Sequence, residues 1–155
     1  MMTLAEIENL VAAQKLISAG LRLSIVQYLT NITTNAARSL WYESHGQKPP
    51  NGKLPETSLY FMETSTGAAR ISAFAVFYTQ TYDKNYHVTP ERLISSFDVF
   101  VKFIPNFDIN AAYRVIKDLS IGFVSLKRCT DCEAVFIYTP EHRRAHKCPF
   151  CIQRG

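Results

Sequence analysis

All four cysteines of the 155-residue sequence stand in its last twenty-nine residues, in two C-x2-C pairs. Cys129 and Cys132 form the first pair, Cys148 and Cys151 form the second, and fifteen residues separate the pairs. A C-x2-C turn presents two sulfur atoms on one side of a tight bend. Two such turns that face each other supply the four thiolates of a tetrahedral zinc site. The spacing therefore predicts one structural Zn²⁺ per chain, bound by these four residues.

Other chemistries use similar residues. CPFC, residues 148–151, is similar to the C-P-x-C half of rubredoxin-type iron sites, which also use four thiolates. A redox-active CxxC is typical of a thioredoxin-like βαβ setting, which this sequence lacks. His142 and His146 could each replace a cysteine as ligand, although four cysteines already complete the set. A closed four-thiolate site leaves no position for a reactive water, which disfavours zinc hydrolysis.

Basic residues surround the cysteines. The segment 127–155 has six Lys or Arg and three acidic residues, in a chain with formal charge +4. The segment 22–53 has four basic residues and only one acidic residue. Because Lys and Arg contact nucleic-acid phosphates, we interpret both segments as candidate DNA contacts, with a merely solvated basic surface as the alternative. The candidates are Arg38, Lys48, Lys53, Lys127, Arg128, Arg143, Arg144 and Lys147.

Helical periodicity dominates the residues that must position these groups. We expect helices over about 3–19, 21–29, 34–45, 59–82, 90–104 and 108–122, with a threonine at 33 or 34 and Asp108 as N-caps. Short strands are expected at 124–128 and 133–138, around the first cysteine pair. GQKPPNGKLPE, residues 46–56, contains three prolines and two glycines and predicts an irregular arm.

The predicted fold is therefore mainly α. A multi-helix body, residues 1–122, would comprise a helix-turn-helix-like segment at 21–46, the arm at 46–56 and aromatic helices at 58–122. Residues 123–155 would form a small zinc-ribbon-like knuckle that is too short to bury a core of its own. Zinc would then supply its folding free energy, about 10–16 kcal/mol in small zinc peptides.

The helix-turn-helix-like segment has two interpretations. Asn35, Arg38, Ser39 and Tyr42 would share one polar face of its second helix, and such a face could lie in a major groove. Ala37, Leu40 and Trp41 would pack inward. An ordinary helical hairpin gives the same pattern, so the pattern leaves a role in DNA binding open.

Residues 37–61, ARSLWYESHGQKPPNGKLPETSLYF, resemble the flagellar transcriptional activator family FlhC. LISAGLRL, residues 16–23, and the two C-x2-C pairs also fit this family, so that the resemblance covers nearly the whole chain. The matching residues of the central run are Arg38, Tyr42, Glu43, Gly46, Pro49, Pro50, Gly52, Leu54, Pro55 and, with a shift of one residue, Ser58.

The resemblance implies a mainly helical fold with a zinc-binding region held by the four cysteines. It also implies assembly with FlhD, as a heterohexamer of four FlhD and two FlhC chains, that binds promoter DNA and recruits RNA polymerase to flagellar operons. We therefore expect a cytoplasmic DNA-binding transcriptional activator. The alternative is a zinc-ribbon assembly subunit that binds only protein.

An enzyme and a membrane protein are both disfavoured. The sequence has no P-loop, no nucleotide-binding glycine fingerprint and no H-E-x-x-H. It has no apolar run of the ~20 residues needed to span a bilayer, and MMTLAEIENL lacks the start of a secretory signal. The central helices are rich in aromatic residues, most of which we expect in the core, with some left to contact a partner. These residues are Phe74, Phe77, Tyr78, Phe97, Phe100 and Phe103.

Overall fold

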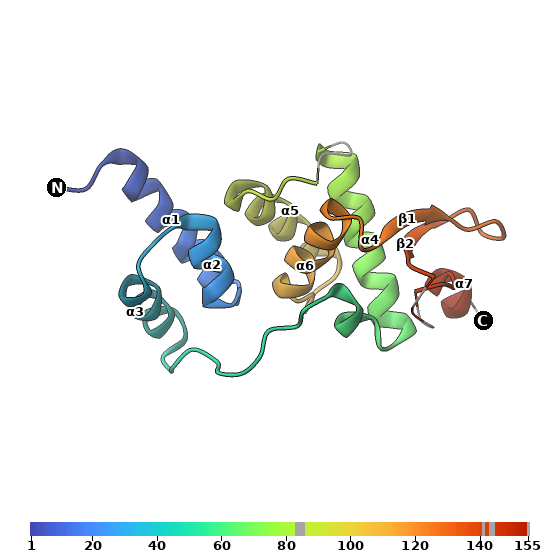
Figure 1. The fold of residues 1–155 in the computed structure, drawn as a ribbon, viewed down its shortest axis with the longest axis horizontal. Coiled ribbons are helices and arrows are strands. Elements are labelled where there is room, and N and C mark those ends of the chain that lie inside the picture. The colour runs from blue at the N-terminus through green and yellow to red at the C-terminus, as the bar shows by residue number, and fades with distance from the viewer. Residues whose placement is uncertain (83–85, 141, 143–144, 155) are drawn as a thin grey trace. The chain divides into compact units, whose positions relative to one another are not determined.

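The computed structural model of the chain describes residues 1–82, 86–140, 142 and 145–154, and it is mainly helical, as predicted (Figure 1). One two-stranded sheet and a cluster of four cysteines lie towards its C-terminal end. In chain order the elements are α1 (Leu4–Ser18), α2 (Leu23–Thr30), α3 (Thr34–His45), the 3-10 helix η1 (Ser58–Met62), α4 (Ser65–Tyr82), α5 (Pro90–Phe103), α6 (Ile109–Ser120), β1 (Ser125–Arg128), β2 (Val135–Tyr138) and α7 (Pro149–Arg154).

Local sequence explains where most helices begin and end. The Thr3 hydroxyl accepts a hydrogen bond from the backbone N–H of Glu6, whose carboxylate accepts one from the backbone N–H of Thr3, which makes a capping box. Thr33 caps α3 and Asp108 caps α6 through their side chains, as predicted. Gly46, in the left-handed conformation, ends α3 and begins the arm.

The prediction of one helix over 59–82 is wrong at its N-terminal end. The 3-10 helix η1 comes first, and α4 begins only at Ser65. The Thr64 hydroxyl accepts a hydrogen bond from the backbone N–H of Gly67 at 3.0 Å, which marks a new helix start. A Cβ atom at Gly67 would lie 2.5 Å from the carbonyl oxygen of Phe61, so glycine lets the two segments lie this close.

The chain divides into two compact units. The first comprises Met1–Leu54 and Thr89–Ser95, and the second comprises Pro55–Val88 and Ser96–Gly155. In the first unit α1 packs against α2 and α3, and Ala37 and Trp41 on α3 are buried, as expected. The predicted division into a helical body, residues 1–122, and a zinc-binding knuckle, residues 123–155, stays a prediction.

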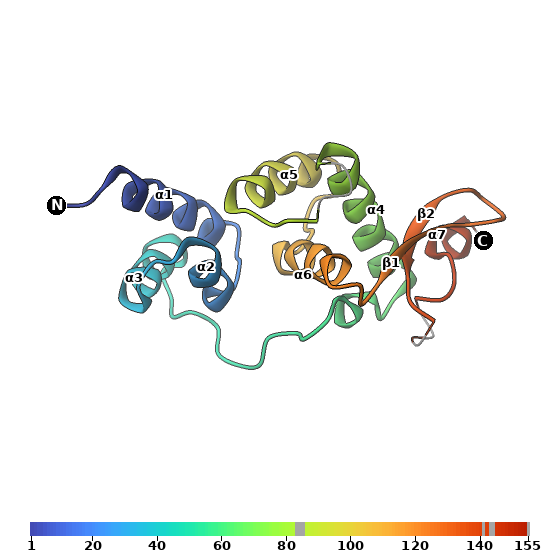
Figure 2. The same ribbon diagram turned by 45° about the horizontal axis from the view of Figure 1, so that its top comes forward.

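Helix α4 is the centre of the second unit. It contacts η1 and α6, and it also contacts β2 and α7, which both views place beside it (Figures 1 and 2). Phe74 is fully buried, with its ring 5.3 Å from that of Phe100 and 5.4 Å from that of Phe107. Phe103 on α5 is 77% exposed, so the aromatic residues are mostly core, with a minority at the surface.

The C-terminal hairpin shares this core. Strands β1 and β2 are antiparallel, with Leu126 opposite Ile137. Ile137 is fully buried, and its backbone N–H donates to the hydroxyl of Ser72 on α4. Burial against α4 therefore adds to whatever stabilisation a metal provides. No helix in the described ranges has both the length and the apolar character that crossing a bilayer requires.

Candidate metal centre

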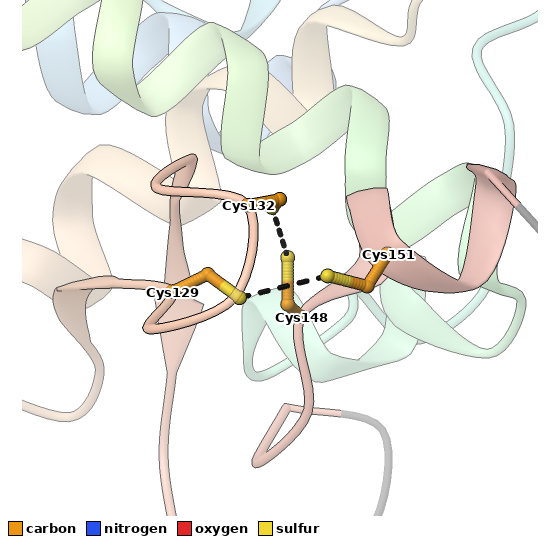
Figure 3. Close-up of side chains that lie close together, drawn as sticks. All are labelled: Cys129, Cys132, Cys148 and Cys151. Atoms are coloured by element: carbon orange, nitrogen blue, oxygen red, sulfur yellow. Dashed lines mark hydrogen bonds between the residues drawn. The ribbon is translucent and has the colours of Figure 1, made fainter.

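The four cysteine side chains point toward one another (Figure 3). Their Sγ atoms all lie within 4.8 Å of one another. The Sγ atoms of Cys129 and Cys151 are 3.6 Å apart, as are those of Cys132 and Cys148, so each close pair joins the two C-x2-C turns. A tetrahedral site with Zn–S bonds of about 2.3 Å has S···S edges of about 3.8 Å. The donor set and its dimensions fit a four-thiolate metal site.

The first turn follows β1 and is fixed by the backbone. The N–H of Cys129 donates to the carbonyl of Ala134 at 2.8 Å, and the N–H of Glu133 donates back to the carbonyl of Cys129 at 3.0 Å. Glu133 reverses the chain in the left-handed conformation, with φ 66°. The N–H of Asp131 points at the Cys129 sulfur over 3.4 Å. Hydrogen bonds of the protein therefore shape this half of the site.

The second turn opens α7, which the sequence analysis did not predict. Pro149 is the first residue of α7, a position that suits proline because the first helical N–H has no partner within the helix. Cys148 directly precedes the helix and is buried, and Cys151 lies within its first turn. Because α7 packs against α4, this half of the site is held by the helical core.

An apolar shell surrounds the sulfur atoms. Phe136 from β2 forms one buried cluster with Cys129 and Cys148. Tyr138 and Phe150 pack against this cluster. Cys129 and Cys148 are each 8% exposed. Such a shell keeps water from the thiolates and strengthens their electrostatic interaction with a cation.

The thiols differ in acidity. Hydrogen bonds from the backbone, first that of Cys132 and then that of Asp131, lower the pKa of Cys129 to about 7. Burial raises the pKa of Cys148. The neighbouring sulfurs, first that of Cys132, raise the pKa of Cys151 to about 12. A divalent cation among the sulfurs would favour all four thiolates, because it offsets their mutual repulsion.

The two histidines considered as alternative ligands lie outside this cluster. The Nδ1 atom of His146 is 3.1 Å from the backbone carbonyl oxygen of His142, and His146 is exposed. Within the described part of the chain, the metal-ligating side chains that come together are the four cysteines alone. The geometry favours a four-cysteine site over one that includes histidine.

The candidate DNA contacts occur in both units. Arg143 and Arg144 lie outside the described residues. Lys127 places its ammonium 4.3 Å from the centre of the Tyr138 ring, and Arg128 donates from Nη1 to the carbonyl of Glu133 at 2.9 Å. Both residues of β1 therefore have defined positions beside Cys129. The exposed candidates are Arg38, Lys48 and Lys53 in the first unit and Lys127, Arg128 and Lys147 in the second.

Comparison with known proteins gives one consistent match. The profile of the family described as "Flagellar transcriptional activator (FlhC)" matches residues 2–154, including all four cysteines. The chain belongs to the FlhC family. The membership confirms the family resemblance predicted from the sequence, and it places the chain among transcriptional regulators of flagellar biogenesis.

Individual FlhC proteins are distant relatives of the chain along nearly all of its length. The flagellar transcriptional regulator FlhC of Variovorax paradoxus is 25% identical, over 96% of this chain and 76% of the relative. The FlhC of Enterobacter cloacae is 24% identical, over 96% of this chain and 81% of the relative. The FlhC of Gallionella capsiferriformans is 25% identical, over 96% and 85% respectively.

Proposed function

We propose that this FlhC-family chain is the DNA-binding subunit of a complex that activates transcription of flagellar operons. In the proposal it acts in the cytoplasm with an FlhD-type subunit, as four FlhD and two FlhC chains, and the complex recruits RNA polymerase. It has no enzymatic role. The observation that carries the proposal is the family match across residues 2–154, and the exposed basic residues in both units support it.

The metal of the proposed centre is one structural Zn²⁺ per chain, bound by Cys129, Cys132, Cys148 and Cys151. When bound, the ion would offset the thiolate charge and crosslink the hairpin to α7. The protein itself supplies the N–H groups that orient the first turn and the apolar shell that excludes water. The four-thiolate donor set supports zinc, which accepts tetrahedral sulfur coordination without electronic preference.

In the proposed complex the basic residues contact DNA phosphates. Lys127 and Arg128 stand directly before Cys129 on β1, so the hairpin and the metal centre together fix where their cationic groups lie. Lys48 and Lys53 are exposed on the arm and Arg38 on α3. Arg143, Arg144 and Lys147 complete the set predicted from the sequence.

The test is a mobility shift with flagellar promoter DNA, using the chain co-expressed with an FlhD-type subunit, over a series of salt concentrations. Each phosphate contact contributes about −0.9 to the slope of log K against log salt. Because the proposed complex holds two copies of the chain, exchange of both Lys127 and Arg128 for alanine removes four contacts and should reduce the slope by about 3.6. Lys102→Ala is the matched control, because Lys102 is exposed on α5 and is no candidate contact.

The opposite results have clear meanings. Absent or salt-insensitive binding by the complex would refute the DNA-binding proposal. Full binding and activation after Lys127 and Arg128 are exchanged for glutamate would instead favour a subunit that binds only protein. We also expect the chain alone to be poorly soluble and to be rescued by the FlhD-type subunit. The exposed apolar residues Leu4, Ile7 and Phe103 support this expectation.

A further inference from the structure

Arg22 links the beginning of α2 to the irregular arm, residues 46–56. Its Nη2 atom donates to the carbonyl of Gly52 at 3.0 Å and to the carbonyl of Pro50 at 3.5 Å. These contacts span 30 and 28 positions of sequence within the first unit. One guanidinium thus contacts two carbonyl groups of a segment that has no regular secondary structure.

The arm lies against α2 around this contact. An open pocket of about 500 Å³ lies beside this contact, lined on the helix side by Arg22, Leu23 and Ser24 and on the arm side by residues 49–54. Gly52 has φ +115°, a conformation that other residues rarely adopt. The direction of the Gly52 carbonyl toward Arg22 therefore depends on glycine. Pro49 and Pro50 further restrict the arm, because each fixes its own φ.

We propose that Arg22 is a positioning residue for DNA binding, which holds the arm so that Lys48 and Lys53 meet the phosphate backbone in one arrangement. This proposal rests on the proposed function. Lys48 and Lys53 are both exposed on the held segment, one on each side of Pro50. An arm fixed before binding loses less conformational entropy when it contacts DNA, and so it binds more tightly with the same number of contacts.

A positioning role differs from a direct phosphate contact in its salt dependence. If Arg22 itself neutralised a phosphate in each of the two copies of the chain, Arg22→Ala would reduce the slope of log K against log salt by about 1.8. If Arg22 holds the arm, Arg22→Ala lowers the affinity at every salt concentration and leaves the slope unchanged. Loss of two hydrogen bonds predicts a decrease in affinity of about tenfold.

Gly52→Ala disturbs the same contact by changing the backbone that carries the acceptor carbonyl, and it changes no charge. A Cβ at Gly52 meets no neighbouring atom within 4 Å, so the effect of the substitution comes from backbone strain and not from a clash. We expect Gly52→Ala to lower the DNA affinity about as much as Arg22→Ala. The double variant should be little worse than either single variant, because both act on one contact.

The arm can be followed without DNA. Limited trypsin digestion cleaves after Lys53, whereas the bond after Lys48 precedes proline and resists trypsin. Both variants should speed cleavage after Lys53 about tenfold and leave the melting temperature of the complex unchanged, because opening of the arm is local. Arg70→Ala, which removes an exposed arginine from α4, is the control and should change neither cleavage nor DNA affinity.

Each outcome decides a different statement. Unchanged cleavage in both variants would overturn the proposed hold on the arm. Faster cleavage with unchanged DNA affinity would overturn the positioning role. A reduced salt slope for Arg22→Ala, with normal affinity for Gly52→Ala, would make Arg22 a direct contact instead. Failure of the unaltered complex to bind DNA would overturn the proposed function itself. The digestion experiment uses no DNA, so its result would still test whether Arg22 holds the arm.

Discussion

The hydroxyl of Ser72 on α4 accepts a hydrogen bond from the backbone N–H of Ile137 on β2 at 3.0 Å, across 65 positions of sequence. Both residues are fully buried. The bond fastens the outer edge of β2 to the central helix of the second unit. The strand that packs beneath the cysteine cluster is therefore held by a helix in addition to any metal.

Ser72→Ala should destabilise the second unit. The substitution leaves the buried N–H of Ile137 without its acceptor, which costs about 1–3 kcal/mol of the free energy of unfolding. Urea denaturation of the purified complex measures the loss. Ser39→Ala on the exposed surface of α3 is the control and should change stability by less than about 0.5 kcal/mol. Equal effects of the two substitutions would contradict the role given to Ser72.

Cys129→Ala should release the proposed zinc. One ligand fewer leaves an open, strained site, and elemental analysis should find well under one zinc per chain. Hydrogen exchange should show lost protection in 125–151, while far-UV circular dichroism changes little because most helices lie outside this region. Thr130→Ala, one residue further along, is the matched control. Retention of one zinc per chain by the Cys129 variant would contradict the four-cysteine site.

Asp118 should be more important for stability than any exposed carboxylate. Its Oδ2 atom accepts a hydrogen bond from the backbone N–H of Ser58 at 2.6 Å, and the residue is 1% exposed. Asp118→Ala removes a hydrogen bond that joins α6 to η1 and leaves the buried N–H of Ser58 without its acceptor, which should cost about 1–3 kcal/mol in chemical denaturation. Asp98→Ala, at an exposed position of α5, should cost almost nothing. The assignment fails if the two variants denature at the same midpoint.

Glu133 offers a test of the first cysteine turn. Its φ of 66° costs an ordinary L-residue about 1–2 kcal/mol, which glycine avoids at an entropic cost of similar size. Glu133→Gly should therefore keep stability and metal content nearly unchanged. Glu133→Val should weaken both, since a β-branched residue is strongly disfavoured at positive φ. Thermal melting with metal analysis distinguishes them, and a Val variant as stable as the Gly variant would refute the account.

The features that the sequence predicted correctly are local. Thr33 and Asp108 cap the helices that they precede, because capping depends on side chains within three residues. The cysteine pairs also predict their own convergence, since their spacing suits a metal. The family was predicted from the FlhC resemblance of the arm, because residue chemistry alone did not identify it.

The features that the sequence analysis missed are either short local breaks or contacts distant in sequence. The break before α4 is local, because the Thr64 hydroxyl caps a new helix within a run whose helical period continues across it. Helix α7 is too short to show a period. Ser72 is an inconspicuous helical serine until β2 lies beside it. In the sequence Arg22 is one of four basic residues of the segment 22–53, whereas in the structure its guanidinium contacts the arm.

The way in which β2 is covered has a consequence for the life of the protein. Val135–Tyr138 is a short run of β-branched and aromatic residues, a composition that favours intermolecular cross-β stacking when it is exposed. On the other strand, exposed Lys127 and Arg128 oppose the addition of a further chain. A molecule whose hairpin detaches from α4 would expose this run, so that self-association would compete with refolding, and the two basic side chains would slow the self-association.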